Sequence, residues 1–297
     1  MTTRLAHFSD VHVTSAPLSE RWSAILGKRI AGTGNYYVGG RRHLFRGSDA
    51  RLEALLADID GQGVDHALCT GDVTQMSYPS EFARCAELFG ERVRRPERWS
   101  VIPGNHDRYT REAAHERRFE RFFGAISAPS GRYPWVKHVD DRVTLVMIDV
   151  TRPTGLVDSS GLCGSEQLQV LSEVLSGDAL RGRFVVVALH YGLLRADGRP
   201  DRPRHGVRDA DQLLRLLDGE RSRVHLVLHG HLHEAFLLDR PNYQILCAGS
   251  ATDLAHGGSY HVIEVGEGAA RAHRRSWDPS TGGYALAETL ELAPWRA

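Results

Sequence analysis

The chain has 297 residues, which is long enough to bury a full hydrophobic core, and its 41% apolar and 25% charged content is ordinary for a folded globular protein. The 37 basic and 37 acidic residues cancel, so no overall charge is available to hold a long nucleic acid or an anionic membrane. This balance disfavours a nuclease with an extended nucleic-acid track.

The 16 histidines are the one unusual count, because histidine is the commonest metal ligand in proteins. The four cysteines lie far apart without a Cys-x-x-Cys pair, which argues against a zinc ribbon and against a disulfide framework. The N-terminus lacks an apolar signal region, and the absence of a long apolar run predicts no transmembrane segment. We therefore expect a cytoplasmic protein and, because no Pro/Ser-rich linker divides the chain, a single domain over residues 1–297.

The first predicted strand runs from Leu5 to Phe8 and leads into Ser9-Asp10-Val11-His12. In an extended backbone, residues i and i+2 face the same way, so Asp10 and His12 could bind one ion together. Residues 15–47 follow as an inserted lid-like segment in which basic and aromatic residues interleave. This segment is either a solvated lid with a small apolar anchor or a contact for a phosphate-bearing or lipid-bearing partner.

Two helices and two strands are predicted next. Ser48 could cap a helix with a buried leucine stripe that ends near Gly61, and a strand over residues 64–70 then ends in Gly71-Asp72. Pro79 opens a second helix, which leads to a strand over residues 98–102. That strand is broken by Pro103-Gly104 and followed by Asn105-His106-Asp107, three polar side chains without a gap.

The middle of the chain continues the same alternation. Residues 110–124 predict one helix, residues 143–149 a buried strand, and Ser165 the cap of another helix. A buried strand over residues 184–189 ends in His190, and the Pro/Arg-rich residues 195–208 predict a surface loop near that histidine. Each of these strands is followed by a helix or a polar turn, which is typical of an α/β fold.

The last predicted helix, capped by Asp209, precedes a strand over residues 224–228 that ends in His229-Gly230-His231-Leu232-His233. Three histidines in five residues indicate a metal site, because burying several imidazoles together is unfavourable without a partner. The strand-like runs at 243–247, 260–265, 269–277 and 284–292 predict antiparallel strands that complete a second sheet.

Five predicted strand ends thus deliver metal-binding side chains, and these strand ends meet at one edge of an α/β sheet. Carboxylate, amide and imidazole donors without a thiolate suit Mn, Fe, Zn or Co, with Mn or Fe favoured. Seven donors oversupply one ion, whereas two ions that share a bridging carboxylate fit the count. The donors are Asp10, His12, Asp72, Asn105, His190, His231 and His233.

The sequence resembles the calcineurin-like metallophosphoesterases, whose signature blocks are Asp-x-His, Gly-Asp, Gly-Asn-His-Asp/Glu, His and Gly-His-x-His. All five blocks occur here in that order over residues 10–233. The resemblance implies a four-layer α/β/β/α sandwich of two mixed sheets with flanking helices. It also implies two metal ions.

Carried over by position, the family pattern implies that Asp10, His12 and His233 hold one metal, and that Asn105, His190 and His231 hold the other. Asp72 would bridge them. His106 would contact a phosphoryl oxygen or protonate the leaving group, with Asp107 orienting its ring, while His229 lies outside the motif and is expected to be structural. Such a metal pair would make hydroxide available near neutral pH for in-line attack on phosphorus.

Departures from the family narrow the choice of substrate. The residues after Asp72, Val73-Thr74-Gln75, differ from those that follow Gly-Asp in the protein phosphatases. The extra tyrosine ligand of the purple acid phosphatases has no counterpart near this block. The chain is most similar to the branch of bacterial class III cyclic nucleotide phosphodiesterases, which implies a small phosphodiester substrate. Alternatives are a pyrophosphatase for a nucleotide-linked lipid or sugar, against which His106 counts, and a non-catalytic binding scaffold, against which the complete ligand set counts.

Overall fold

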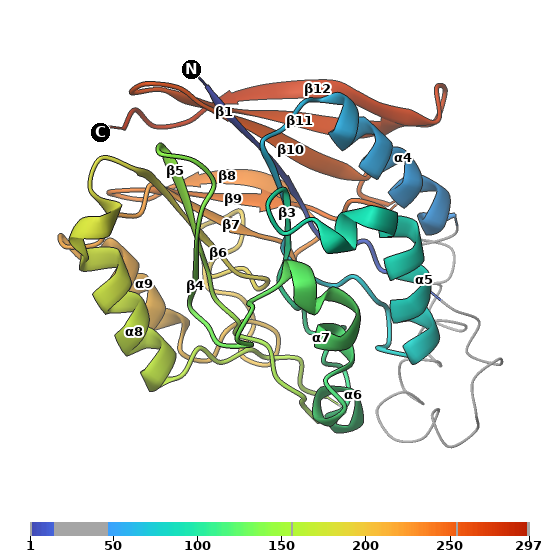
Figure 1. The fold of residues 1–297 in the computed structure, drawn as a ribbon. Coiled ribbons are helices and arrows are strands. Elements are labelled where there is room, and N and C mark those ends of the chain that lie inside the picture. Colours follow the sequence, from blue (N-terminus) through green and yellow to red (C-terminus); the bar gives the residue numbers. More distant parts are fainter. Residues whose placement is uncertain (1, 15–46, 156, 254, 296–297) are drawn as a thin grey trace.

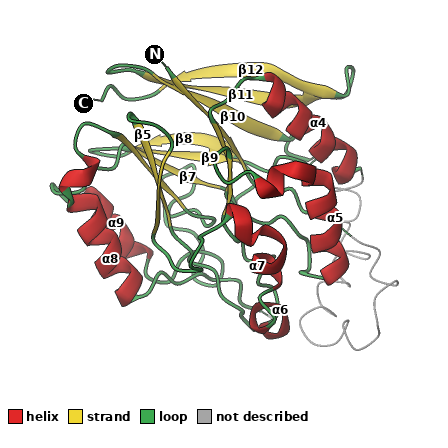
Figure 2. Cartoon of the chain, in the orientation of Figure 1, coloured by secondary structure: helices red, strands yellow, loops and turns green. Residues whose placement is uncertain are grey.

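The computed structural model describes residues 2–14, 47–155, 157–253 and 255–295 (Figure 1). Two six-stranded sheets face each other, and helices cover their outer faces (Figures 1 and 2). The expected four-layer sandwich is therefore confirmed. The lid-like segment 15–47 lies outside the described residues except for Gly47, and the single-domain assignment stays a prediction.

The first sheet has the order β12-β11-β10-β1-β2-β3. Its strands β1, β2 and β3 are parallel, and β10 to β12 continue the sheet in antiparallel fashion from β1. The strands are β1 (Thr3–Phe8), β2 (His66–Cys69), β3 (Trp99–Val101), β10 (Ser259–Val265), β11 (Ala270–Asp278) and β12 (Gly283–Glu291).

The second sheet has the order β4-β5-β6-β7-β9-β8. Its four central strands, β5, β6, β7 and β9, are parallel, while β4 and β8 pair antiparallel at the two edges. The strands are β4 (Trp135–His138), β5 (Val143–Met147), β6 (Phe184–Ala188), β7 (Leu226–His229), β8 (Ala235–Asp239) and β9 (Gln244–Ala248).

The helices are α4 (Ser48–Gly61), α5 (Pro79–Phe89), α6 (Arg111–His115), α7 (Arg118–Phe123), α8 (Ser165–Ser176) and α9 (Ala210–Asp218), with short 3-10 turns at Gly90–Arg94, Gly124–Ile126 and Asp178–Leu180. Helices α4 and α5 pack on the first sheet, and α8 and α9 pack on the second. No helix in the described part of the chain is long and apolar enough to cross a membrane.

Alternation along the strands creates the layers. In β6, Val185 and Val187 face the outer helices, whereas Val186 and Ala188 face the other sheet. Because successive side chains of a strand point to opposite faces, a wholly apolar run can fill both layers at once. Burial on both faces holds the sheet between its outer helices and the other sheet. Because its central strands are parallel, their carboxyl ends lie at the same edge.

Several local predictions were wrong. Gly47 and Gly164, rather than Ser48 and Ser165, occupy the N-cap positions of α4 and α8. Asp209 is the N-cap residue of α9, but its carboxylate accepts hydrogen bonds from the backbone amides of Cys163 and Gly164 instead of capping the helix. Asp209 therefore ties two loops together.

Two larger corrections concern helix continuity and sheet partners. Residues 110–124 form two short helices, because Arg117 has a left-handed backbone with φ 51° that ends the first one. The strands β10 to β12 extend the first sheet rather than the second, and β9 is parallel to β7. Strands β4 and β8 were not predicted. Alternation of apolar and polar residues identifies a strand but does not show which strand pairs with it.

Candidate metal centre

The loops that follow β1, β2, β3, β6 and β7 converge at one edge of the sandwich. Backbone hydrogen bonds join them, since Asp10 N donates to Gly71 O at 3.0 Å and Gly230 N donates to His190 O at 3.0 Å. Bonds from His231 N to Asp10 Oδ2 and from His106 N to Asp72 Oδ1 complete the connection of the five loops. The connected loops bring together all seven side chains predicted as metal ligands.

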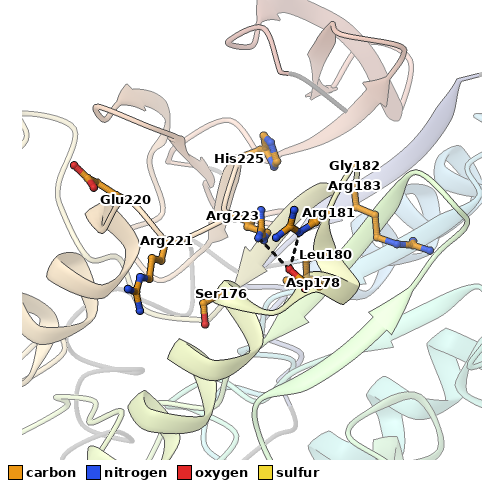
Figure 3. Close-up of a pocket in the computed structure, with 11 residues that line it drawn as sticks. Ser176, Asp178, Leu180, Arg181, Gly182, Arg183, Glu220, Arg221, Arg223 and His225 are labelled. Atoms are coloured by element: carbon orange, nitrogen blue, oxygen red, sulfur yellow. Dashed lines mark hydrogen bonds and ion pairs between the residues drawn. The ribbon is translucent and has the colours of Figure 1, made fainter.

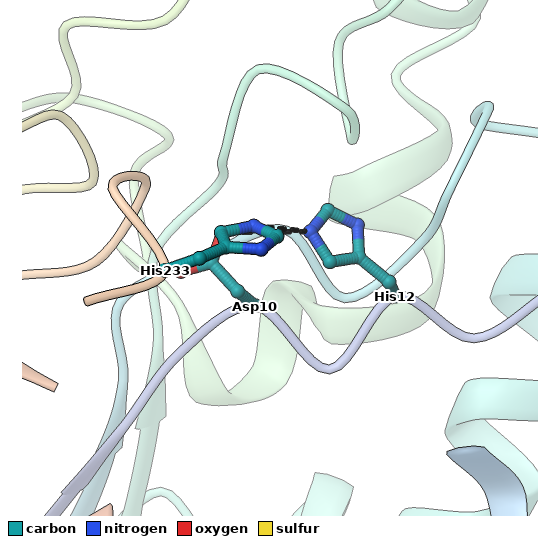
Figure 4. A group of neighbouring side chains, drawn as sticks. All are labelled: Asp10, His12 and His233. Carbon is teal, nitrogen blue, oxygen red and sulfur yellow. Dashed lines mark hydrogen bonds and ion pairs between the residues drawn. The ribbon is translucent and has the colours of Figure 1, made fainter. Parts of the chain in front are cut away.

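Asp10, His12 and His233 form the first cluster, in which the Nε2 atoms of the two tilted imidazole rings point toward each other (Figure 4). The Nε2 atoms of His12 and His233 lie 3.1 Å apart, and they lie 3.5 and 3.3 Å from Asp10 Oδ1. Asp10 Oδ1 is buried and receives no hydrogen bond from the described residues. A carboxylate oxygen and two imidazole nitrogens that point at a common centre form a donor set that fits a divalent cation.

Asn105, His190 and His231 form the second cluster. His190 Nε2 lies 3.0 Å from Asn105 Oδ1 and 3.3 Å from His231 Nδ1. Asp72 stands between the clusters, because its Oδ2 lies 3.3 Å from His190 Nε2 and 3.9 Å from His12 Nε2. One carboxylate oxygen thus faces both groups, which is the position that a bridging ligand requires.

Five of these seven residues have left-handed backbone conformations. The φ angles are 55° for Asp10, 45° for His12, 55° for Asp72, 68° for His231 and 57° for His233. The expectation of an extended backbone at Asp10 and His12 was therefore wrong, although the two side chains do meet. Each such conformation costs on the order of 1 kcal/mol or more and persists only where the surrounding structure enforces it.

The motif glycines are explained by close approach of neighbouring groups. A Cβ atom on Gly104 would overlap the carboxylate of Asp72, and one on Gly230 would overlap the carboxylate of Asp10. The two carboxylates are held there by backbone amides, since His106 N donates to Asp72 Oδ1 at 2.7 Å and His231 N donates to Asp10 Oδ2 at 2.8 Å. Glycine at these two positions therefore lets the backbone amides of His106 and His231 reach the carboxylates of Asp72 and Asp10, two of the predicted metal ligands.

A second layer of contacts fixes the imidazoles. His190 Nδ1 lies 2.8 Å from Thr70 O, His233 Nδ1 lies 3.2 Å from Asp253 Oδ2, and His231 Nε2 lies 3.1 Å from His205 O. Each of these three oxygen atoms accepts a hydrogen bond, so the ring nitrogen next to it carries a proton. The other nitrogen of each ring then faces the centre of its cluster. Asp253 and His205 were missed in the sequence, where neither belongs to the motif blocks, although Asp253 follows the Gly249-Ser250-Ala251-Thr252 turn.

His106 lies beside the first cluster, with its ring centroid 5.0 Å from that of His12. Its Nδ1 is hydrogen-bonded to the carbonyl oxygen of Gln75. The Asp107 carboxylate instead accepts from the backbone amides of Gly104 at 2.8 Å and Thr74 at 2.9 Å. The prediction that Asp107 orients the ring was therefore wrong, because Asp107 holds the loop and Gln75 holds the ring.

The carboxylates and imidazoles shift one another's pKa values. Burial alone would raise the pKa of Asp72, but the charge of His190 and other histidines lowers it below its usual range. Burial lowers the pKa of His190 and His233, yet Asp72 and Asp10 respectively outweigh it and raise both values to about 9. Protons on these imidazoles thus supply the positive charge that metal ions would supply.

A cavity of about 240 Å³ opens above the two clusters. Its walls contain no arginine or lysine among the described residues. The lining residues are Asp72, Asn105, His106, Tyr109, Val157, Asp158, Ser159, His205, His231 and His233. The cavity therefore gives access to both predicted metal positions from one side.

A larger groove of about 650 Å³ lies elsewhere, along the segments before β6 and β7 (Figure 3). Arg181 and Arg223 point toward Asp178 at its centre, with nitrogen to oxygen distances of 2.6 and 3.6 Å, while Arg183 and Arg221 point away from them. Because the central cations are already paired with a carboxylate, this groove presents no convergent donor set.

The comparisons agree with the geometry. A family model described as calcineurin-like phosphoesterase matches residues 3–235. The chain belongs to the calcineurin-like phosphoesterase family. A comparison with curated protein sequences finds no match.

Solved structures share the fold at low sequence identity. A dimetal phosphatase from Danio rerio is 14% identical, with 99% of each chain covered and a TM-score of 0.68. A purple acid phosphatase from yellow lupin seeds is 11% identical, with 99% of this chain and 54% of that chain covered and a TM-score of 0.60. GAP50, an anchor in the inner membrane complex of Plasmodium, is 12% identical, with 99% and 90% covered and a TM-score of 0.58. Enzymes and an anchor protein thus share this fold.

Proposed function

We propose that this protein is a dinuclear-metal-dependent phosphodiesterase that hydrolyses a small phosphodiester, such as a cyclic nucleotide or a generic diester. The observation that carries the proposal is the position of Asp72 Oδ2 between two donor clusters, 3.9 Å from His12 Nε2 and 3.3 Å from His190 Nε2. In this proposal Asp10, His12 and His233 hold one ion, and Asn105, His190 and His231 hold the other.

When bound, two such cations would lower the pKa of a bound water and stabilise negative charge on a phosphoryl group. The protein's own residues orient that chemistry. Thr70 O, Asp253 and His205 O hold the ligand imidazoles in one tautomer each. His106 lines the cavity and, held through Nδ1 by Gln75, is placed to contact the phosphoryl group or to protonate the leaving oxygen.

The charge of the cavity favours a diester. A phosphomonoester carries up to two negative charges and a pyrophosphate more, whereas a diester carries one. The described lining residues include no lysine or arginine, and the carboxylate of Asp158 at the rim is paired with Arg208 at 2.7 Å. A monoanionic diester therefore needs the least charge compensation from the protein.

The shared fold of an anchor protein raises the scaffold alternative again. Against it, all seven donors are present, and five of them are held in strained backbone conformations. Strained backbone conformations cluster at active sites, ligand clamps and switch regions, where the surrounding structure holds them for a specific geometry. We therefore propose an enzyme rather than a binding scaffold.

A substrate panel tests this proposal. Purified protein reloaded with Mn, Fe, Zn or Co should hydrolyse bis(p-nitrophenyl) phosphate and cyclic nucleotides faster than phosphomonoesters or pyrophosphates. A consistent preference for monoesters would overturn the diester assignment. Inactivity on every phosphoester with every metal would overturn the proposal that the protein is a phosphoesterase. The native metal pair and the cytoplasmic location stay predictions.

A further inference from the structure

The loop between β6 and α9 carries a concentration of positive charge that the metal centre does not use. Residues 195–208, here called the basic loop, contain five arginines against two aspartates, a formal charge of +3 in a chain whose total charge is zero. The charge balance of the whole chain therefore conceals a local cationic surface. All five arginines are exposed: Arg195, Arg199, Arg202, Arg204 and Arg208.

Most of this charge has no counterion within the described part of the protein. Arg208 pairs with Asp158 at 2.7 Å, and Arg195 interacts electrostatically with Asp201. The other three form neither an ion pair nor a side-chain hydrogen bond with any described residue: Arg199, Arg202 and Arg204. Three guanidinium groups can therefore meet an anionic partner without breaking an internal contact.

The basic loop is held in one shape by backbone hydrogen bonds. Arg195 N donates to Arg199 O at 2.8 Å, which closes a turn at the start of the loop. Nearer its end, Arg204 O accepts from Ser159 N at 2.9 Å, so the loop is joined to the segment that lines the cavity. The backbone that carries the arginines is thus fixed before a partner binds, which reduces the entropy lost on binding.

Two exposed apolar side chains lie on the segment that is bonded to the basic loop. Val157 is 75% exposed and Leu162 is 40% exposed, and they are two of the four large apolar side chains that lie exposed in the described ranges. Between them, Gly161 forms a parallel bridge with Val207 of the basic loop. Exposed cations beside exposed aliphatic groups suit a lipid bilayer, whose anionic head groups cover an apolar interior.

A single-stranded nucleic acid is the other polyanion that such a surface could attract. Proteins that bind single strands place aromatic rings along the groove, because successive bases stack on them. Residues 157–162 and 195–208 contain no Phe, Tyr or Trp. Unpaired arginines next to exposed aliphatic side chains, without aromatic rings among them, favour the bilayer.

We propose that residues 157–162 and the basic loop form a docking surface for an anionic lipid bilayer. Each arginine near such a bilayer strengthens binding about fivefold, and the aliphatic side chains add contact with the acyl boundary. Because Val157 and His205 also line the cavity, the docked bilayer would lie beside the cavity mouth. This inference goes beyond the proposed function and requires neither bound metal nor turnover.

Sedimentation with lipid vesicles measures this binding directly. In about 0.1 M NaCl, the full chain should bind phosphatidylcholine vesicles with about 30% phosphatidylglycerol some 10- to 100-fold (roughly fivefold per unpaired arginine) more tightly than pure phosphatidylcholine vesicles. About 0.5 M NaCl should remove most of this preference, because salt screens exposed charges. Equal binding to the two kinds of vesicle at low salt would overturn the proposal.

Two triple variants with the same loss of charge separate this surface from the rest of the molecule. R199Q/R202Q/R204Q should lose most of the preference for anionic vesicles, about fivefold per arginine. The control, R94Q/R181Q/R271Q, removes three arginines whose side chains are 76%, 68% and 59% exposed at other places in the chain, and it should bind as the wild type does. Equal losses in both variants would show that total charge alone matters and would overturn the docking surface.

A fluorescent single-stranded oligonucleotide tests the other polyanion under the same conditions. At equal concentrations of negative charge, it should bind more weakly than the anionic vesicles. Tighter binding to the oligonucleotide that is lost in R199Q/R202Q/R204Q would assign the surface to nucleic acid and overturn the bilayer.

Hydrolysis of bis(p-nitrophenyl) phosphate by the same preparations tests the proposed function separately, because this soluble substrate needs no bilayer. Absent hydrolysis with intact vesicle binding would refute the phosphodiesterase and leave the docking surface standing. Hydrolysis without any preference for anionic vesicles would refute the docking surface alone.

Discussion

His106 is the residue whose role the geometry defines most narrowly. It lines the cavity, stacks on Tyr109 and is held through Nδ1 by Gln75. We expect His106→Ala to keep the metal content and to slow turnover by about 10²- to 10⁴-fold. The loss should be largest for esters with poor leaving groups, which need a proton most. Equal losses of activity on p-nitrophenyl and alkyl esters would show that His106 does not protonate the leaving group.

Gly104 is a position at which one methyl group should disturb the centre. A Cβ atom there would overlap the carboxylate of Asp72, whereas a Cβ atom on Gly61, in α4, would meet no atom within 4 Å. Gly104→Ala should therefore lower metal content, measured by elemental analysis after gel filtration. Gly61→Ala is the matched control and should bind metal as the wild type does. Equal metal content in both variants would contradict this account of the motif.

Asp253 holds His233 from outside the cluster, with its Oδ2 3.2 Å from His233 Nδ1. Loss of a carboxylate behind a metal-binding histidine typically weakens metal affinity by about 10- to 100-fold. We expect this loss for Asp253→Asn in competition titrations with a metal indicator. An affinity equal to that of wild-type protein would show that His233 needs no such support.

Among the elements, α4 is attached to the first sheet through Asp58. The Asp58 carboxylate accepts from Tyr260 OH at 2.6 Å and from Arg275 Nε at 2.7 Å, and its side chain is 19% exposed. Asp58→Ala leaves these donors without their acceptor, so the free energy of unfolding should fall by about 1–3 kcal/mol. Metal content should not change, because the site lies at the carboxyl ends of the strands.

Asp60, on the same helix, is the control for Asp58. It pairs with Arg92, but its side chain is 52% exposed. Exposed ion pairs contribute about 0–1 kcal/mol, so Asp60→Ala should unfold in urea almost as wild-type protein does. If both variants lose the same stability, the contact of Asp58 with β10 and β11 does not hold the helix.

For the whole molecule, the histidine pKa values predict how pH acts on the metal-free protein. His190 and His233 have pKa values of about 9 in the folded state, above the usual 6.5. Their stabilising contribution is therefore complete below about pH 6.5 and is lost as the pH rises through about 9. Asp107, whose pKa is raised to about 7 by burial and by Asp72, acts in the same direction at lower pH.

Urea unfolding of metal-free protein between pH 6 and pH 9.5 measures this dependence. The free energy of unfolding should fall across the range. Metal-loaded protein should not show the histidine part of the fall, because metal ions take the place of the protons. A metal-free protein that gains stability toward pH 9.5 would contradict the charge assignment.

The sequence predicted the layers of the fold and seven candidate metal ligands that the structure brings together, for a physical reason. Apolar runs such as residues 184–189 and polar residues directly after them mark strands and strand ends without any knowledge of neighbours. What failed depended on tertiary partners: β10 joins β1 rather than the second sheet, and Arg117 interrupts a helical pattern. Sequence periodicity does not show which strands pair with each other or where a single residue interrupts a helix.

The supporting residues of the site were also beyond the sequence. Asp253 and His205 act through contacts with His233 and His231, which lie 20 and 26 positions away along the chain. Gln75 holds His106 with a backbone carbonyl, which any residue type would provide. Only the fold places these groups, whereas the motif residues are recognisable because their side-chain chemistry is specific.

The central claim is that two metal ions share Asp72, and anomalous diffraction from a metal-soaked crystal tests it most directly. The account predicts two anomalous peaks about 3.5–4 Å apart, one beside Asp10, His12 and His233 and the other beside Asn105, His190 and His231, with Asp72 between them. A single peak, or peaks away from these seven side chains, would contradict it.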